Sequence, residues 1–221
     1  METLGAQDVK AILTNLAAHI EACKEELGRL DQVIGDGDLG LTMSKGFRAA
    51  ADAVAAMQET DVGQVLGNAG MVIASTAPST MGTLMGTGFM RAGKAVAGKQ
   101  AVSLEDVAAM MAAFVEGIMI RGKAKPGDKT VLDALHPAVE ALKAAVASGQ
   151  SVAEGLASAY RAAEQGLEAT KDMVAQHGKA ACFHEKTLGK PDPGATVGML
   201  LMKALAEYAA RTERPGQAGV C

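Results

Sequence analysis

Apolar side chains recur every three or four residues along most of the chain, a spacing that places them on one face of an α-helix. The first such stripe lies within VKAILTNLAAHIEACKEEL, residues 9–27. Similar stripes follow at residues 41–58, 61–74, 83–97, 103–121, 131–148, 151–176 and 194–212. No segment shows sustained alternation of β-branched and polar residues. The pattern predicts an all-α protein of about eight helices.

Short polar or glycine-rich segments, such as AGKQ and ASGQ, separate the predicted helices. Ser103 is followed at three positions by Asp106, which is the spacing of a capping box at a helix start. Because short connections place consecutive helices antiparallel, we expect an eight-helix up-and-down bundle or barrel. We assign residues 1–212 to a single helical domain and residues 213–221 to a flexible C-terminal tail.

The composition narrows the class of protein further. Hydrophobic residues make up 49% of the chain but aromatic residues only 3%, so the core must be built from Ala, Leu, Val and Met. The net charge of −4 gives no general attraction to nucleic acid or to an anionic membrane, and no apolar run is long enough to span one. Three widely spaced cysteines without a C-x-x-C pair disfavour a disulfide framework or a zinc site. We therefore expect a cytoplasmic protein whose partners include neither nucleic acid nor membrane.

The segment LDQVIGDGDLGLTM, residues 30–43, concentrates negative charge in a stretch that glycines allow to bend. Its three aspartates are Asp31, Asp36 and Asp38. Gly35 and Gly37 disfavour continuation of the preceding helix. If the chain leaves the helix after Val33, Asp36 and Asp38 project to the same side, and Asp31 faces them from the last helical turn.

Carboxylates this close together repel one another, and a bound cation removes the conflict. A small set of oxygen ligands favours Mg²⁺, which completes its coordination with water and phosphate oxygens. Two such ions would leave a positive surface suited to phosphate. An acidic turn that caps the helix beginning near Leu41 is the alternative explanation.

Four glycine-rich patches, at residues 35–40, 82–88, 122–130 and 189–194, precede alternate helices of the predicted bundle. Because alternate connections of such a bundle lie at the same end, we expect the patches to meet there. The segment STMGTLMGTGF, residues 79–89, offers backbone N–H groups at a helix start, which suit an anion, without the lysine of a P-loop. Close helix packing through small residues is the alternative for this segment.

Three motifs resemble the nucleotide-binding L-subunit of dihydroxyacetone kinases. LDQVIGDGDLG resembles the acidic metal-binding motif of that family, PGDKTVLDALHP its G-D-K-T-M-L-D-A-L-x-P segment, and GKPDPGATV its G-H-P-D-P-G-A stretch. The order and spacing match over residues 5–212. The resemblance implies an eight-helix antiparallel barrel with the nucleotide, ADP or ATP, at one end. It also implies that Asp31, Asp36 and Asp38 hold two Mg²⁺ ions.

The resemblance further implies a kinase subunit that is active only with a partner. A separate K-subunit would bind a small ketose, and the phosphoryl donor would be ATP or, as we prefer, a phosphocarrier of the phosphotransferase system. A homodimer is an arrangement that the sequence leaves open. The alternative function is a non-catalytic, nucleotide-sensing regulatory subunit that binds a transcription factor or another partner. A plain helical scaffold with an acidic capping turn is the third interpretation.

We expect no nucleophile in this chain and assign the candidate site residues to nucleotide contacts. They are Leu39, Thr42, Ser79, Thr80, Met81, Gly82, Thr83, Leu84, Met85, Gly122, Asp128, Thr130, Lys186, Asp192, Pro193 and Gly194. Met81, Leu84 and Met85 are the candidates for an apolar adenine slot. Compared with the family pattern, Leu39 replaces a histidine, Met81 a serine, Met85 an aromatic residue and Lys186 an arginine.

Overall fold

A computed structural model describes residues 2–213, and helices occupy most of them. The α-helices are α1 (Ala6–Ala22), α2 (Lys24–Ile34), α3 (Leu39–Ala55), α4 (Val62–Thr76), α5 (Thr80–Ala95), α6 (Leu104–Gly122), α7 (Leu132–Ala147), α8 (Val152–Ala169) and α9 (Pro193–Glu213). Two 3₁₀ segments, η1 (Thr170–Asp172) and η2 (Lys179–Thr187), and two short strands, β1 (Leu4–Gly5) and β2 (Ala101–Val102), complete the elements. The all-α prediction is confirmed. Of the predicted tail, only Glu213 lies within the described residues, and it ends α9.

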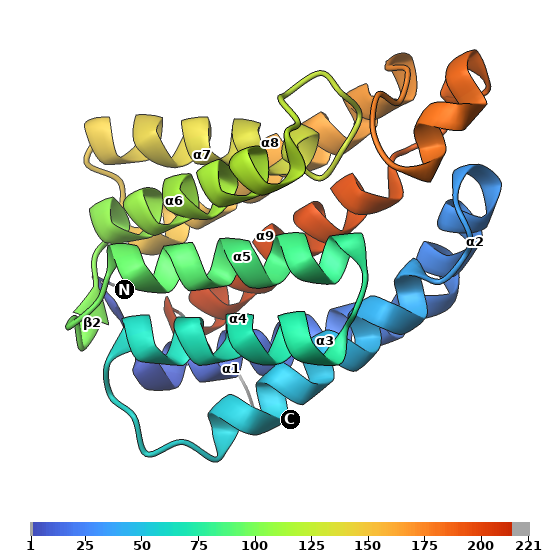
Figure 1. The fold of residues 1–221 in the computed structure, drawn as a ribbon. Helices are drawn as coiled ribbons and strands as arrows, with labels where there is room; N and C mark the ends of the chain where they lie inside the picture. The colour runs from blue at the N-terminus through green and yellow to red at the C-terminus, as the bar shows by residue number, and fades with distance from the viewer. Residues whose placement is uncertain (1, 214–221) are drawn as a thin grey trace, which may run out of the picture.

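The first predicted helix is two helices in the structure, so the described residues hold nine α-helices rather than eight. α1 ends at Ala22, and the N–H of the next residue, Cys23, still donates to the carbonyl of His19. The apolar stripe of α1 ends at Ile20, and α2 buries only Leu27 and Ile34. α2 is thus a separate helix from α1, and it packs against the segment η2 (Figure 1).

The predicted helix over residues 151–176 was too long, because α8 stops at Ala169. The next residue, Thr170, still donates its hydroxyl to the Leu167 carbonyl at 2.6 Å but also bonds residues outside the helix. Its carbonyl accepts from the Lys129 ammonium, and its hydroxyl accepts from the Asp192 N–H at 2.9 Å. These tertiary bonds turn the chain where the apolar spacing alone continues.

The helices pack into a closed ring around an apolar interior (Figure 1). Contacts run in chain order from α3 to α9, and α1 completes the ring because it packs against both α9 and α3. Inside, Phe89 stacks edge-on against Phe47 and Phe114, with ring centroids 6.1 and 5.1 Å apart. The assignment of residues 1–212 to one domain stays a prediction.

Glycines allow α4 and α5 to approach closely, as the scarcity of large side chains suggests. A Cβ on Gly63 would lie 2.5 Å from the carbonyl oxygen of Gly93, and a Cβ on Gly70 would lie 2.7 Å from that of Gly86. No larger residue fits these positions without moving the helices apart. Close approach through small residues therefore holds this pair together.

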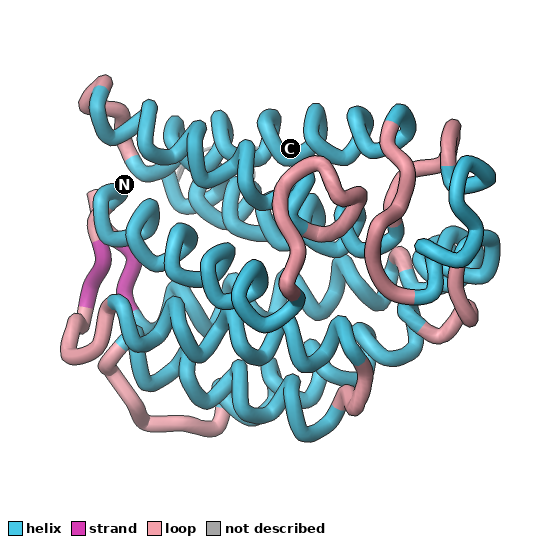
Figure 2. Tube along the Cα trace, turned by 45° about the horizontal axis from the view of Figure 1, so that its top comes forward, coloured by secondary structure: helices cyan, strands magenta, loops and turns pink. Residues whose placement is uncertain are grey.

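The two ends of the ring differ. At one end β1 and β2 pair antiparallel, with Leu4 opposite Val102, and tie the start of the chain to the connection before α6. At the other end lie the connections α2–α3, α4–α5, α6–α7 and α8–α9, several of them long loops (Figure 2). Across the described residues, no helix combines the length and apolar character needed to cross a membrane.

Candidate functional site

An open pocket of about 440 Å³ lies at the end of the ring that carries these connections. All four predicted glycine-rich patches contribute to its lining, for example through Gly35, Leu84, Thr130 and Gly194. Residues as far apart in sequence as Asp31 and Gly194 thus share one cavity. The fold therefore gathers at this end the backbone and side-chain groups that the sequence distributes along the chain.

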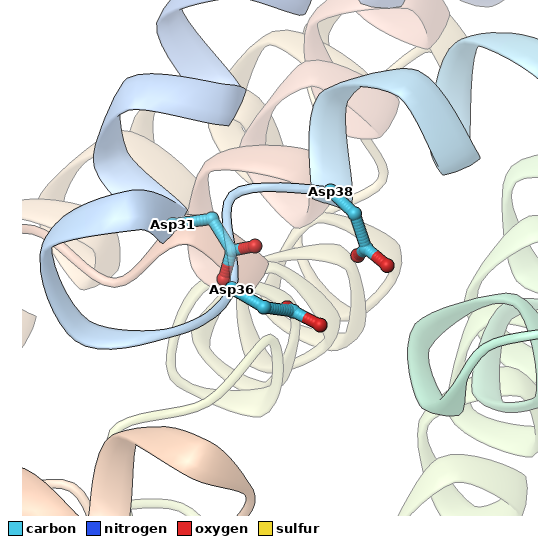
Figure 3. A group of neighbouring side chains, drawn as sticks. All are labelled: Asp31, Asp36 and Asp38. Atoms are coloured by element: carbon cyan, nitrogen blue, oxygen red, sulfur yellow. The ribbon is translucent and has the colours of Figure 1, made fainter.

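The three aspartates lie together at the rim of this pocket (Figure 3). Asp31 lies on the last turn of α2, Asp36 in the connection, and Asp38 directly before α3. One carboxylate oxygen from each lies within 4.8 Å of the others. Three carboxylates this close together are a group that could hold a metal ion.

Glycines set this geometry. α2 ends at Ile34, one residue beyond the expected Val33, and Gly37 has a φ of 78°, which disfavours any residue with a Cβ. A Cβ on Gly35 would lie 2.2 Å from the Oδ1 atom of Asp31. The bend therefore leaves room for the Asp31 carboxylate only because position 35 lacks a side chain.

The charges around the aspartates are consistent with a cation site. Desolvation raises the pKa of Asp31, and the neighbouring charges of Asp36 and Asp38 raise it further. The Lys179 ammonium hydrogen-bonds the carboxylate of Asp36 and holds the pKa of that group below its usual value. The cluster offers only oxygen donors and already attracts the Lys179 ammonium. Such a cluster fits a hard divalent ion such as Mg²⁺.

Lys179 and His177 are pocket residues that the sequence reasoning missed. Both lie in the irregular segment between η1 and α9, where no periodicity indicates the direction of a side chain. The His177 ring bonds the Asp128 carboxylate, with 2.9 Å between Nε2 and Oδ2. The sequence reasoning chose Lys186 as the cation of this segment, but Lys186 lies near the other end of η2 and outside the pocket lining.

The structure brings many of the predicted nucleotide contacts to the pocket. Those in the lining are Leu39, Ser79, Thr80, Met81, Leu84, Thr130, Asp192, Pro193 and Gly194. Ser79 caps α5, because its hydroxyl accepts from the Gly82 N–H at 3.0 Å. Asp192 caps α9 through the Ala195 N–H at 2.7 Å, and burial raises the pKa of Asp192 to about 7.

Other predicted contacts lie outside the lining. They are Thr42, Gly82, Thr83, Met85, Gly122, Asp128 and Lys186. Met85 is fully buried in the core, and Gly82 packs against Ala77, where a Cβ would lie 2.0 Å from the carbonyl oxygen. Asp128 accepts from the Lys125 N–H at 2.9 Å as well as bonding His177. Contact with a nucleotide stays a prediction for every one of the candidate positions.

The fold and the pocket define the class: an all-α protein in which a ring of helices carries a cluster of three carboxylates at one end. The chain belongs to the DAK2 domain family, whose model matches residues 33–207. The predicted resemblance is thereby confirmed.

Several relatives share most of this chain. It is 38% identical over 182 residues to the ADP-binding subunit DhaL of the PEP-dependent dihydroxyacetone kinase of Escherichia coli K12, covering 82% of this chain and 87% of that one. It is 36% identical over 208 residues to L-erythrulose 1-kinase of Mycolicibacterium smegmatis, covering 93% of this chain but 36% of that enzyme. The dihydroxyacetone kinase of C. freundii in complex with AMP-PNP and Mg²⁺ matches with a TM-score of 0.69 and 28% identity, over 94% of this chain and 34% of that one. The chain thus spans about a third of the two larger kinases.

Proposed function

We propose that this chain is the nucleotide-binding subunit of a dihydroxyacetone-type kinase, which holds ADP or ATP with Mg²⁺ and relays a phosphoryl group to a small ketose on a partner K-subunit. The observation that carries the proposal is the cluster of Asp31, Asp36 and Asp38 at the rim of an open pocket. The E. coli relative is named an ADP-binding subunit, and the C. freundii relative was solved with AMP-PNP and Mg²⁺, in keeping with this assignment.

Each part of the site has a role in this proposal. Asp31, Asp36 and Asp38 would hold the ions, and bound Mg²⁺ would neutralise the charge of the β- and γ-phosphates. The exposed ammonium of Lys179 adds a positive charge beside them. Met81 and Leu84 offer apolar surface for the adenine ring. Catalysis would rest on positioning and on charge stabilisation, with no covalent intermediate on this chain.

We propose the partners from the comparison with the larger kinases. L-erythrulose 1-kinase contains a segment similar to this chain within about a third of its length. A free-standing subunit would therefore need a second chain to hold the sugar, for which we propose a K-subunit. A phosphocarrier of the phosphotransferase system is our proposed donor, in line with the PEP-dependent kinase named for the E. coli relative.

Calorimetric titration with ADP in the presence of Mg²⁺ tests the metal site. We expect Asp36→Asn and Asp38→Asn each to weaken ADP binding by roughly 100-fold, since each removes a charged ligand. Asp52→Asn, which changes an exposed carboxylate on α3, is the matched control and should bind as the wild type does. Undiminished ADP binding in the two site variants would refute the proposal.

A nucleotide-sensing regulator is the second candidate function, and one feature favours it. Leu39 and Met81, both on the pocket lining, put apolar side chains where the family pattern has a histidine and a serine. Such a protein would bind ADP with Mg²⁺ without supporting transfer. Phosphorylation of dihydroxyacetone in the presence of the cognate K-subunit and donor separates the two functions.

A further inference from the structure

One buried lysine holds together the irregular segment that overhangs the aspartates. We call residues 171–190 the strap; it contains η2 and places His177, Gly178, Lys179 and Ala180 on the pocket lining. Lys129 lies outside the strap, in the connection between α6 and α7, and only 2% of its surface is exposed.

The Lys129 ammonium donates to three backbone carbonyls at the two ends of the strap. The acceptors are Thr170, just before the strap, Thr187 at 2.9 Å and Lys190 at 2.7 Å. A direct hydrogen bond from the Gly189 N–H to the Lys171 carbonyl, at 2.7 Å, also joins the two ends of the strap. The lysine therefore gives a charged donor to the Thr187 and Lys190 carbonyls and shares the Thr170 carbonyl with the Met173 N–H.

The backbone conformation at Lys129 indicates that a lysine side chain is required at this position. Its φ is 60°, in the left-handed region that favours glycine. A glycine would fit the backbone with less strain but would leave the three carbonyls without this charged donor. The neighbouring Asp128 contacts the middle of the strap, through the His177 ring and through the Gln176 N–H at 3.1 Å. Two consecutive residues thus fix the ends and the middle of one segment.

The far side of the strap meets the candidate metal site. Lys179, the first residue of η2, forms an ion pair with Asp36, and η2 packs against α2, which carries Asp31. We propose that Lys129 is a positioning residue whose ammonium holds the strap so that Lys179 stands over the aspartate cluster and meets the nucleotide phosphates. This inference rests on the proposed function of the pocket.

The test combines a substitution with a distant control. Lys129→Met keeps the bulk of the side chain and removes the donors; we expect it to weaken ADP binding in Mg²⁺ by roughly tenfold. Affinity for Mn²⁺ alone should not fall, because the aspartates lie on α2 and on the connection between α2 and α3 rather than on the strap. Lys10→Met is the control, since Lys10 is also buried and donates to a carbonyl, that of Met57 at 2.7 Å, at the opposite end of the ring. Equal ADP affinity in the two variants would overturn the proposal.

A double-mutant cycle tests whether Lys129 acts through Lys179. In a Lys179→Met background, the further change Lys129→Met should alter ADP affinity less than twofold, because the group to be positioned is gone. Full additivity of the two effects would mean that Lys129 acts by another route, and the proposal would fall.

Hydrogen exchange in the wild-type protein tests whether the strap is held in place, and this test applies even if Lys129→Met fails to fold. In the ligand-free wild type, the amides of Gly189 and Ala175, which bond the Lys171 carbonyl and the Thr187 hydroxyl, should be protected. Exchange as fast as in an open loop would show that the strap is not held. A wild-type protein that binds no ADP would refute the proposed function, whereas the exchange result still reports whether the strap is fixed.

Discussion

Substitution of Gly35 by alanine should damage the proposed metal site while leaving every carboxylate in the sequence. The new Cβ would lie 2.2 Å from Asp31 Oδ1 and 2.8 Å from the Asp31 carbonyl oxygen, both closer than the 3.0 Å that real Cβ contacts respect. The carbonyl belongs to α2 and cannot move without breaking the helix. The Asp31 side chain must therefore turn away from the cluster.

The loss of metal-binding free energy can be calculated from the lost charge alone. Two unit charges about 4 Å apart attract by about 1 kcal/mol in water, so a divalent ion loses about 2 kcal/mol when one carboxylate leaves. This corresponds to roughly 30-fold weaker binding of Mn²⁺, measured by calorimetric titration. The half-buried position of Asp31 makes the figure a lower bound.

Gly67→Ala is the matched control, because a Cβ there meets nothing within 4 Å. It should leave Mn²⁺ binding unchanged and stabilise α4 by about 0.5–1 kcal/mol through helix propensity. If Gly35→Ala binds Mn²⁺ as tightly as Gly67→Ala does, the glycine does not set the geometry of the aspartates.

Three further predictions concern stability, each measured by urea unfolding. Asp61→Ala should cost about 2 kcal/mol, because this N-cap accepts from Gly63 at 2.7 Å and from Gly98 at 2.8 Å; a change below the error of the method would contradict the capping argument. Gly70→Ala should destabilise by about 1–3 kcal/mol through its clash with the Gly86 carbonyl, and a gain in stability would show that the helices can separate freely. Asp192 has a native pKa raised from 3.8 to about 7, so the stability it contributes is complete below about pH 4 and is lost as the pH rises through 7. Asp192→Asn should therefore flatten the fall in stability between pH 5 and 8, and an unchanged slope would count against the raised pKa.

The sequence predicts most of the helices and the aspartate cluster because both depend on local rules. Glycines on either side of Asp36 stop a helix wherever they occur, and alternation in an extended stretch then turns Asp36 and Asp38 the same way. The meeting of distant glycine-rich patches followed from short connections in an up-and-down arrangement. These inferences needed no tertiary contact.

Features set by tertiary bonds were not predictable in this way. The apolar spacing beyond Ala169 continues through Met173, and only the bonds of Thr170 to Lys129 and Asp192 show that the helix has ended. With that boundary misplaced, the following segment could not be oriented. Lys186 was predicted from the family pattern, in which it replaces an arginine, whereas Lys179 is the strap lysine that lines the pocket.

Closure of the helical ring has a consequence for the synthesis of the protein. The closing contacts join the two ends of the chain: Tyr208 donates to Asp8 at 2.6 Å, and His19 bonds Glu207 at 2.9 Å. α1 can pack against α3 during synthesis, but the inner apolar faces lack part of their cover until α9 has emerged and packs against α1. Although each helix forms locally, closure of the ring joins partners 200 residues apart, a contact of high sequence separation in an all-helical fold.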